Sequence, residues 1–192
     1  MRQVHSNAVY VVDDQALVNG LAGIDADALV TALPNVPLGV LAADCLPIVL
    51  YSAHPRALGV AHAGRMGTYH QVVLATLKAM QQQFAVVPSQ VRVMIGPGIG
   101  GCCYHLDHRA IDPFRECFSD WESYCLPQEP GRWTMDLVRA NRAQLEMAGV
   151  PIAHIESVNM CTVCHCVHLF SHRAEGETAG RGMGMAVLLP ER

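Results

Sequence analysis

The chain has 192 residues, of which 51% are hydrophobic and 16% charged, and its formal net charge is −4. This balance is typical of a globular protein and excludes intrinsic disorder, and the length predicts one domain spanning 1–192. The absence of a basic excess excludes electrostatic binding of nucleic acid or a lipid surface, so we expect neither as a partner.

The first third of the chain is predicted to form strands, because short apolar runs rich in β-branched residues are separated by turn residues. Five strands are expected, at 8–12, 28–31, 38–41, 47–51 and 57–62. The hydrophobic period then changes to three and four residues, which is typical of an amphipathic helix. The apolar stripe of this helix consists of Tyr69, Val73, Leu77, Met80 and Phe84.

The second half alternates strands and helices. Strands are predicted at 91–95, 152–158 and 183–189, and helices at 109–118 and 136–148. Pro113 must lie in the first turn of its helix or kink it, and Gly149 is expected to cap the helix before it. The elements together predict an α/β (α+β layered) fold with mixed β-sheets packed with helices. The early cluster of strands argues against a regular βαβ series.

Eight cysteines and ten histidines are present. The first residues contain no apolar signal-peptide core, so we expect a cytoplasmic protein whose cysteines are thiols rather than disulfides. The longest apolar run is interrupted by Asp44 and Pro47 and falls short of the ~20 residues that a membrane helix needs. Thiols together with imidazoles are the first indication of a bound metal.

Two polar pairs lie in or beside apolar strands. Asp44-Cys45 precedes one predicted strand and His62 ends the next, so both side chains could face one pocket. From spacing alone, a buried cysteine and a hydrogen-bonded core histidine are the simpler interpretation. Two functional interpretations compete with it. One is a zinc site with His5 as the third ligand, and the other is a Cys–His nucleophile pair.

A second group of possible ligands follows near the C-terminus. Cys161 and Cys164 form a Cys-x2-Cys pair, which could be half of a structural zinc site. The other half would come from Cys102-Cys103 or from His165 and His168. Adjacent cysteines are expected to be poor partners for one tetrahedral centre, so buried or incidental thiols are favoured here.

Eight short motifs occur in the order found in a known family. They are Gln3-Val4-His5, Asp25-Ala26-Asp27-Ala28-Leu29-Val30-Thr31, Ala43-Asp44-Cys45-Leu46-Pro47, His62-Ala63-Gly64, Ile95-Gly96-Pro97-Gly98-Ile99, Asp136-Leu137 with Asn141, Cys161-Thr162, and Ser171-His172-Arg173 to Gly180-Arg181. Each motif is weak alone, but the ordered set resembles the YfiH-like laccase-domain proteins. These were first described as multicopper polyphenol oxidoreductases and later as purine nucleoside phosphorylases that also deaminate adenosine.

The resemblance implies a fold similar to the catalytic domain of the cytotoxic necrotizing factors. It also implies a zinc site made by His5, Cys45 and His62, and purine nucleoside and phosphate as substrates. The nucleosides would be adenosine, inosine, guanosine and methylthioadenosine. The family's members carry a segment before Gln-Val-His, so the chain is compatible with loss of that N-terminal segment. We expect His5 to be the least secure ligand because chain ends fray.

A hypothesis for the mechanism assigns further roles within the site. Phosphate would be bound by Arg65 or Arg173, with Arg181 a further substrate-binding candidate, because guanidinium groups pair with phosphate. Asp44, beside Cys45, is the candidate for orienting a ligand or transferring a proton, and Cys45 and His62 are counted as catalytic as well as metal-binding residues. We expect the protein to be a monomer or a homodimer.

Three rival functions remain open. Copper, as a polyphenol oxidoreductase cofactor, is the alternative to zinc, although the chain lacks the His-x-His pairs typical of multicopper oxidases. A Cys–His hydrolase or peptidoglycan-editing factor would use Cys45 as a nucleophile. A zinc-stabilised binding module is the non-enzymatic alternative.

Overall fold

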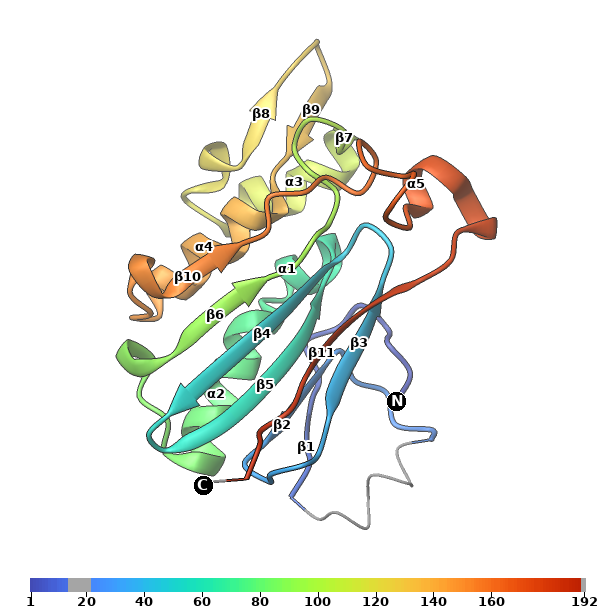
Figure 1. Ribbon diagram of the computed structural model, residues 1–192. Coiled ribbons are helices and arrows are strands. Elements are labelled where there is room, and N and C mark those ends of the chain that lie inside the picture. The colour runs from blue at the N-terminus through green and yellow to red at the C-terminus, as the bar shows by residue number, and fades with distance from the viewer. Residues whose placement is uncertain (14–21, 191–192) are drawn as a thin grey trace.

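A six-stranded mixed sheet forms the centre of the molecule (Figure 1) in the computed structural model, which describes residues 1–13 and 22–190. The outer pairs β1–β2 and β6–β10 are parallel, and the inner pairs β2–β5, β5–β4 and β4–β6 are antiparallel. In spatial order the strands are β1 (Val9–Val11), β2 (Ala28–Thr31), β5 (Arg56–Ala63), β4 (Leu46–Ala53), β6 (Arg92–Ile95) and β10 (Ile155–Ser157).

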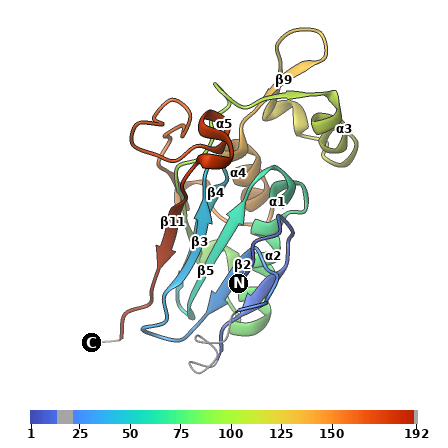
Figure 2. The ribbon, with the colours of Figure 1, turned by 90° about the vertical axis from the view of Figure 1, so that its right-hand side faces the viewer.

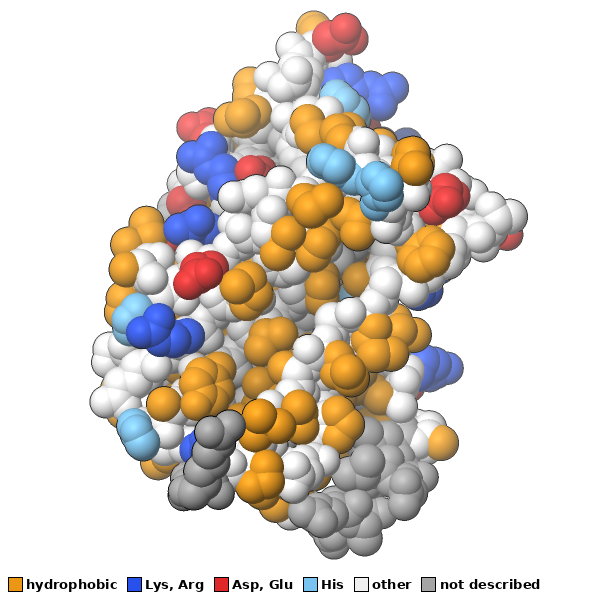
Figure 3. Space-filling model, in the orientation of Figure 1, with side chains coloured by type: hydrophobic (Ala, Val, Ile, Leu, Met, Phe, Trp, Pro, Cys, Tyr) orange, Lys and Arg blue, Asp and Glu red, His pale blue; other side chains and the backbone are white. Residues whose placement is uncertain are grey.

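A two-stranded antiparallel ribbon covers part of one face of this sheet. It consists of β3 (Leu38–Ala42) and β11 (Gly182–Ala186), and Figure 2 shows it on the side opposite the long helix. Val60 of β5 and Leu38 of β3 are buried in the small core between the two layers. The outer side of the ribbon exposes Met183 and Met185. Figure 3 shows hydrophobic side chains gathered over the face of the molecule that the ribbon crosses.

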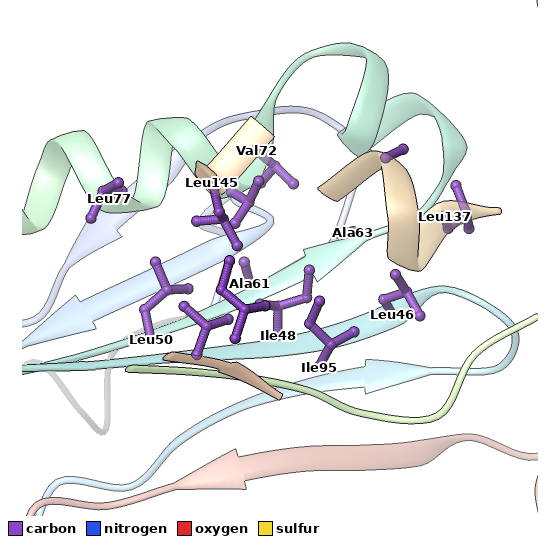
Figure 4. Packing of buried hydrophobic residues seen from close by; sticks show 14 of the residues in the cluster. Leu46, Ile48, Leu50, Ala61, Ala63, Val72, Leu77, Ile95, Leu137 and Leu145 are labelled. Atoms are coloured by element: carbon purple, nitrogen blue, oxygen red, sulfur yellow. The ribbon is translucent and has the colours of Figure 1, made fainter. Parts of the chain in front are cut away.

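The main core lies between the other face of the sheet and two helices. Because side chains alternate along a strand, Ile48 and Leu50 of β4 point to this face, where Ala61 of β5 joins them (Figure 4). Leu77 and Leu145 pack onto them from α2 (Val72–Phe84) and α4 (Leu137–Met147). Full burial of such an aliphatic side chain contributes about 1.5–3 kcal/mol.

The helices follow the predicted hydrophobic period with one interruption. The stripe that begins at Tyr69 is split between α1 (Arg65–Tyr69) and α2, because Gln71 has a left-handed backbone with φ of 60°. The predicted helix at 109–118 is α3 (His108–Cys117), which contains Pro113 in its interior. The helix at 136–148 is α4, with Asp136 as its N-cap. Among the described residues no helix has the length and hydrophobicity needed to cross a lipid bilayer.

The structure differs from the predicted elements in two respects. The run at 152–158 is not one strand, because residues 152–154 form a 3₁₀ turn after Pro151 and only β10 pairs with the sheet. A three-stranded antiparallel sheet was not predicted at all. It comprises β7 (His105–Asp107), β9 (Arg132–Met135) and β8 (Cys125–Pro127), whose three- and four-residue lengths are too short to show a period. The α/β class and the mixed sheets are as predicted.

Candidate metal centre

The turn between β3 and β4 places Cys45 at the end of the sheet. Asp44 has φ of 84°, and its carbonyl accepts a hydrogen bond from Ile99 N–H at 2.8 Å. Pro47 pairs with His62 in the β4–β5 register, so the side chains of Cys45 and His62 share one sheet end and face. The predicted adjacency of the two strands is therefore confirmed.

The N-terminal segment is fixed at several points. Arg2 forms two hydrogen bonds with the Asp25 carboxylate, at 2.7 and 2.5 Å. The Gln3 amide exchanges hydrogen bonds with the backbone of Leu41 in both directions, each at 2.8 Å. The backbone N–H of His5 donates to Asp27 at 3.0 Å. These contacts attach the backbone around His5 to the rest of the fold.

His5, Cys45 and His62 form one cluster. Their ligand atoms all lie within 4.8 Å of one another, and His5 Nε2 is 3.8 Å from Cys45 Sγ. A Cβ at Gly64 would overlap that sulfur, which explains why glycine follows His62-Ala63. One thiol and two imidazoles are donors that zinc accepts in tetrahedral sites, so these residues fit the ion.

Asp27 holds two of the three residues of this cluster in place through hydrogen bonds. It is fully buried and accepts hydrogen bonds from the backbone N–H groups of Val4, His5 and Ser6 and from the Ser6 hydroxyl. His62 Nδ1 lies 3.0 Å from an Asp27 oxygen. A carboxylate only accepts hydrogen bonds, so Nδ1 carries the proton and Nε2 is left for a metal.

The protonation states of Asp27 and His62 suit metal binding, whereas Cys45 must lose its proton to bind a metal. Burial raises the pKa of Asp27, but the hydrogen bonds from His62 and Ser6 outweigh it and lower the pKa below its usual value. Burial lowers the pKa of His62, so its imidazole is neutral at pH 7. Burial, helped by the nearby Asp44 charge, raises the pKa of the Cys45 thiol to about 11.

A cavity of about 530 Å³ opens in front of the cluster. This volume is within the range of roughly 300–1,000 Å³ typical of small-molecule sites. Arg65, Arg173 and Arg181 all line it, together with the aromatic ring of Tyr104. The Arg173 guanidinium lies 5.1 Å from the Tyr104 ring centroid and donates to the His105 carbonyl at 3.2 Å. The three arginines predicted from sequence therefore share one pocket with the cluster.

Asp44 joins the cavity wall to the loop that precedes α5 (His172–Glu175). Its carboxylate accepts hydrogen bonds from the Thr162 hydroxyl at 2.6 Å, the Ser171 hydroxyl at 2.7 Å and the Arg173 N–H at 2.6 Å. Both of its oxygens are engaged in these contacts. This arrangement orients Arg173 at the cavity.

The second group of cysteines also converges. The sulfur atoms of Cys102, Cys103, Cys161 and Cys164 lie within 4.8 Å of one another. Adjacent cysteines were expected to be poor partners, yet the backbone turn brings both thiols to Cys164. His165 instead places Nδ1 2.9 Å from the Cys161 carbonyl.

Comparison with known proteins identifies the family of the chain. The sequence model of the multi-copper polyphenol oxidoreductase laccase family matches residues 1–189. The chain belongs to this family, the YfiH-like laccase-domain proteins. It is 35% identical to the purine nucleoside phosphorylase YlmD of Geobacillus stearothermophilus, covering 94% of this chain and 70% of the relative. It is 33% identical to the adenosine deaminase RL5 of an unknown prokaryotic organism, covering 94% and 71%.

The solved structures show the same fold. The crystal structure of YlmD from Geobacillus stearothermophilus superposes with a TM-score of 0.90 at 33% identity, covering 98% of this chain and 72% of that one. The Bacillus licheniformis hypothetical protein YfiH gives 0.91 at 31% identity, covering 97% and 72%. The predicted family and fold class are confirmed.

Two site residues were missed by the sequence reasoning. Asp27 has no role in the predicted site, although a carboxylate inside the apolar run Ala26 to Val30 is costly unless it serves a buried network. Tyr104 is also absent from the predicted site. Its ring lines the cavity, and burial raises the pKa of its phenol, which therefore stays protonated at pH 7. Nothing in the local spacing of Tyr104 indicates this position.

Proposed function

We propose that this protein is a zinc-dependent purine nucleoside phosphorylase that also deaminates adenosine. Its nucleosides would be adenosine, inosine, guanosine and methylthioadenosine, and its second substrate phosphate. The main support for this proposal is that three potential metal ligands lie beside a cavity lined by arginines. Relatives named for both activities support the proposal. We also propose a cytoplasmic location, where its eight free thiols stay reduced.

His5, Cys45 and His62 would hold the metal. Three protein ligands leave a fourth position open, as in catalytic zinc sites. A bound zinc ion would supply a Lewis acid at the inner end of the cavity. Asp27 fixes the His62 tautomer and the His5 backbone, so the donor atoms are oriented before the metal arrives.

The arginines would bind phosphate. Arg173 is oriented through its own backbone N–H by Asp44, while Arg65 and Arg181 lie at other parts of the cavity wall. Guanidinium groups stabilise the negative charge of an anion that attacks the ribose carbon. The Tyr104 ring offers an aromatic face against which a purine could stack. In this proposal Asp44 positions Arg173, since both its oxygens already accept hydrogen bonds.

One observation favours a second candidate function, a Cys–His hydrolase. Cys45 Sγ lies 3.8 Å from His5 Nε2, close enough for a nucleophile–base pair. The raised pKa of Cys45 disfavours it, because an activated cysteine needs a lowered pKa. Copper polyphenol oxidation remains the third candidate, and metal analysis separates it from zinc chemistry.

The decisive experiment uses the purified protein with its metal content measured. Inosine and adenosine are incubated with and without phosphate, and free base, ribose 1-phosphate and ammonia are quantified. We expect free base and ribose 1-phosphate to be released only when phosphate is present. We expect ammonia to be released from adenosine without phosphate. Absence of all three products from zinc-loaded protein would refute the proposed function, and oxidation of a phenol by copper-loaded protein would favour the oxidase.

A further inference from the structure

A cluster of four thiols lies outside the cavity. The Cys103 and Cys164 sulfurs are 3.5 Å apart, and the Cys102 and Cys164 sulfurs are 3.7 Å apart, although 61 and 62 residues separate them in the sequence. Zinc–sulfur bonds of about 2.3 Å at tetrahedral angles hold sulfur atoms about 3.8 Å apart. The observed separations are therefore close to those of a zinc tetrathiolate.

We propose that Cys102, Cys103, Cys161 and Cys164 bind one zinc ion as a structural site. All four ligand positions would be filled by protein, so this ion would have no open position for substrate, in contrast to the ion at His5, Cys45 and His62. The proposal does not depend on the nucleoside activity, because it concerns a different set of residues.

Local backbone structure prepares the first pair of ligands. The N–H groups of Cys103 and Tyr104 both donate to the Gly100 carbonyl at 3.0 Å, which closes a tight turn around Cys102 and Cys103. This turn directs the two neighbouring sulfurs to the same side. A Cβ at Gly100 would lie 3.2 Å from the Cys161 Cβ and 3.3 Å from the Cys102 sulfur, so glycine lets the two segments approach.

The second pair has the features of a zinc-binding turn. The N–H of Gly100 donates to the Cys161 sulfur at 3.3 Å, and the N–H groups of Val163 and Cys164 also donate to it. Such donors stabilise thiolate charge and orient the ligand, as outer hydrogen bonds do at metal sites. The N–H of His165 donates to the Cys161 carbonyl at 3.0 Å and closes the turn between Cys161 and Cys164.

The position of the site suggests what it does. The turn at 100–104 leads directly to Tyr104, which lines the cavity. The segment that begins at Cys161 contains Thr162, whose hydroxyl binds Asp44, and continues to Arg173. A zinc ion at the four cysteines would therefore clamp together two segments that form the cavity wall. Cross-linking distant segments by a metal stabilises the folded state.

Zinc binding at this site would release protons and would not change any oxidation state. Four thiols would lose four protons to bind Zn²⁺, giving a tetrathiolate with a net charge of −2, and no electron transfer is involved. Cys102 and Cys164 are exposed, so water receives the protons and the ion can enter from solvent. The competing outcome is a disulfide, which would need an oxidant.

The test counts metal in protein purified under reducing conditions from zinc-supplemented culture. Wild type is expected to contain two zinc ions per chain, and Cys164→Ser and Cys45→Ala one each. Cys166→Ser is the matched control, because this exposed thiol lies in the same loop but outside the cluster, and it should keep two. Circular dichroism checks that each variant is folded.

A spectroscopic measurement covers the case in which Cys164→Ser fails to fold. Cobalt(II) loaded into Cys45→Ala should give the intense sulfur-to-metal absorption of a tetrathiolate, and this variant retains all four cysteines. Two findings would each overturn the proposal. One is that the Cys45→Ala protein binds no cobalt. The other is that the mass of the wild-type protein is lower than that of the fully reduced chain by two hydrogen atoms, with a disulfide mapped to these cysteines. Loss of nucleoside activity with both metals retained would refute only the proposed function.

Discussion

The two clusters of potential metal ligands differ in ligand number and in what surrounds them. His5, Cys45 and His62 provide three donors beside a cavity lined by Arg65, Arg173 and Arg181. The four-cysteine cluster provides four donors and lies outside that cavity, among turns that it would tie together. The difference between an open and a filled fourth position is the difference between a reactive and a structural metal site.

The two clusters are also supported by different groups. At the first cluster a buried carboxylate, Asp27, fixes a histidine ring and three backbone N–H groups. At the second cluster backbone N–H groups donate directly to the Cys161 sulfur. Imidazole has a second ring nitrogen that a carboxylate can orient, whereas a thiolate accepts its support through the ligating sulfur itself.

The largest expected effect is that of removing one ligand of the first cluster. Cys45→Ala should lose the cavity metal and at least about 10³-fold in kcat/KM, because metal-ion catalysis supplies several kcal/mol and each 1.36 kcal/mol is tenfold. Steady-state kinetics and metal analysis check this. Cys117→Ala, an exposed thiol outside both clusters, is the control and should retain full activity. Retained metal with lost activity would instead identify Cys45 as a nucleophile.

The next expected effect concerns the arginines that line the cavity. Arg173→Ala should raise the KM for phosphate by roughly 10- to 100-fold, because a hydrogen bond to a charged group is worth about 1.5–3 kcal/mol. Metal content should not change. Initial rates at varied phosphate concentration give the KM for phosphate. The control is Arg92→Ala, because Arg92 lies on the exposed side of β6. An unchanged KM for phosphate would remove Arg173 from the proposed phosphate site.

Asp27→Asn tests the carboxylate behind the first cluster. The amide can present an N–H where the backbone donors need an acceptor, so zinc affinity should fall by roughly 10- to 100-fold, as for other outer-shell changes at metal sites. Competition with a chelator gives the affinity. Asp112→Asn is the same change in α3, outside the ligand cluster and the cavity lining, so its zinc affinity should be unchanged. Equal affinities for the two variants would contradict the role of Asp27.

The last expected effect is on stability rather than on activity, and it concerns the link between the two regions. Thr162 lies beside Cys161, and its hydroxyl donates to Asp44, which in turn binds the Arg173 backbone. Thr162→Val removes one of these hydrogen bonds and should cost about 1.5–3 kcal/mol of unfolding free energy. Denaturant melts measure this, with exposed Thr178→Val as the control. A variant as stable as wild type would show that the two regions are held independently.

Much of the fold is predictable because burial leaves a periodic trace in sequence. The predicted strand at 28–31 coincides with β2, and those at 47–51 and 57–62 lie inside β4 and β5, since their apolar runs are bounded by turns. The helix stripe was also correct, except that a left-handed residue, Gln71, divides it. The short strands β7, β8 and β9 have too few residues for any period to appear.

The sequence by itself determined the chemical types of the site residues and, through ordered motifs, the family. It named His5, Cys45, His62 and the arginines without showing that they meet. Only the tertiary structure decided that meeting, because strand register brings Cys45 beside His62 and a buried carboxylate holds His5 to them. The four cysteines show this most clearly. Their convergence depends on contacts between segments some 60 residues apart, and local spacing carries no signal for such contacts.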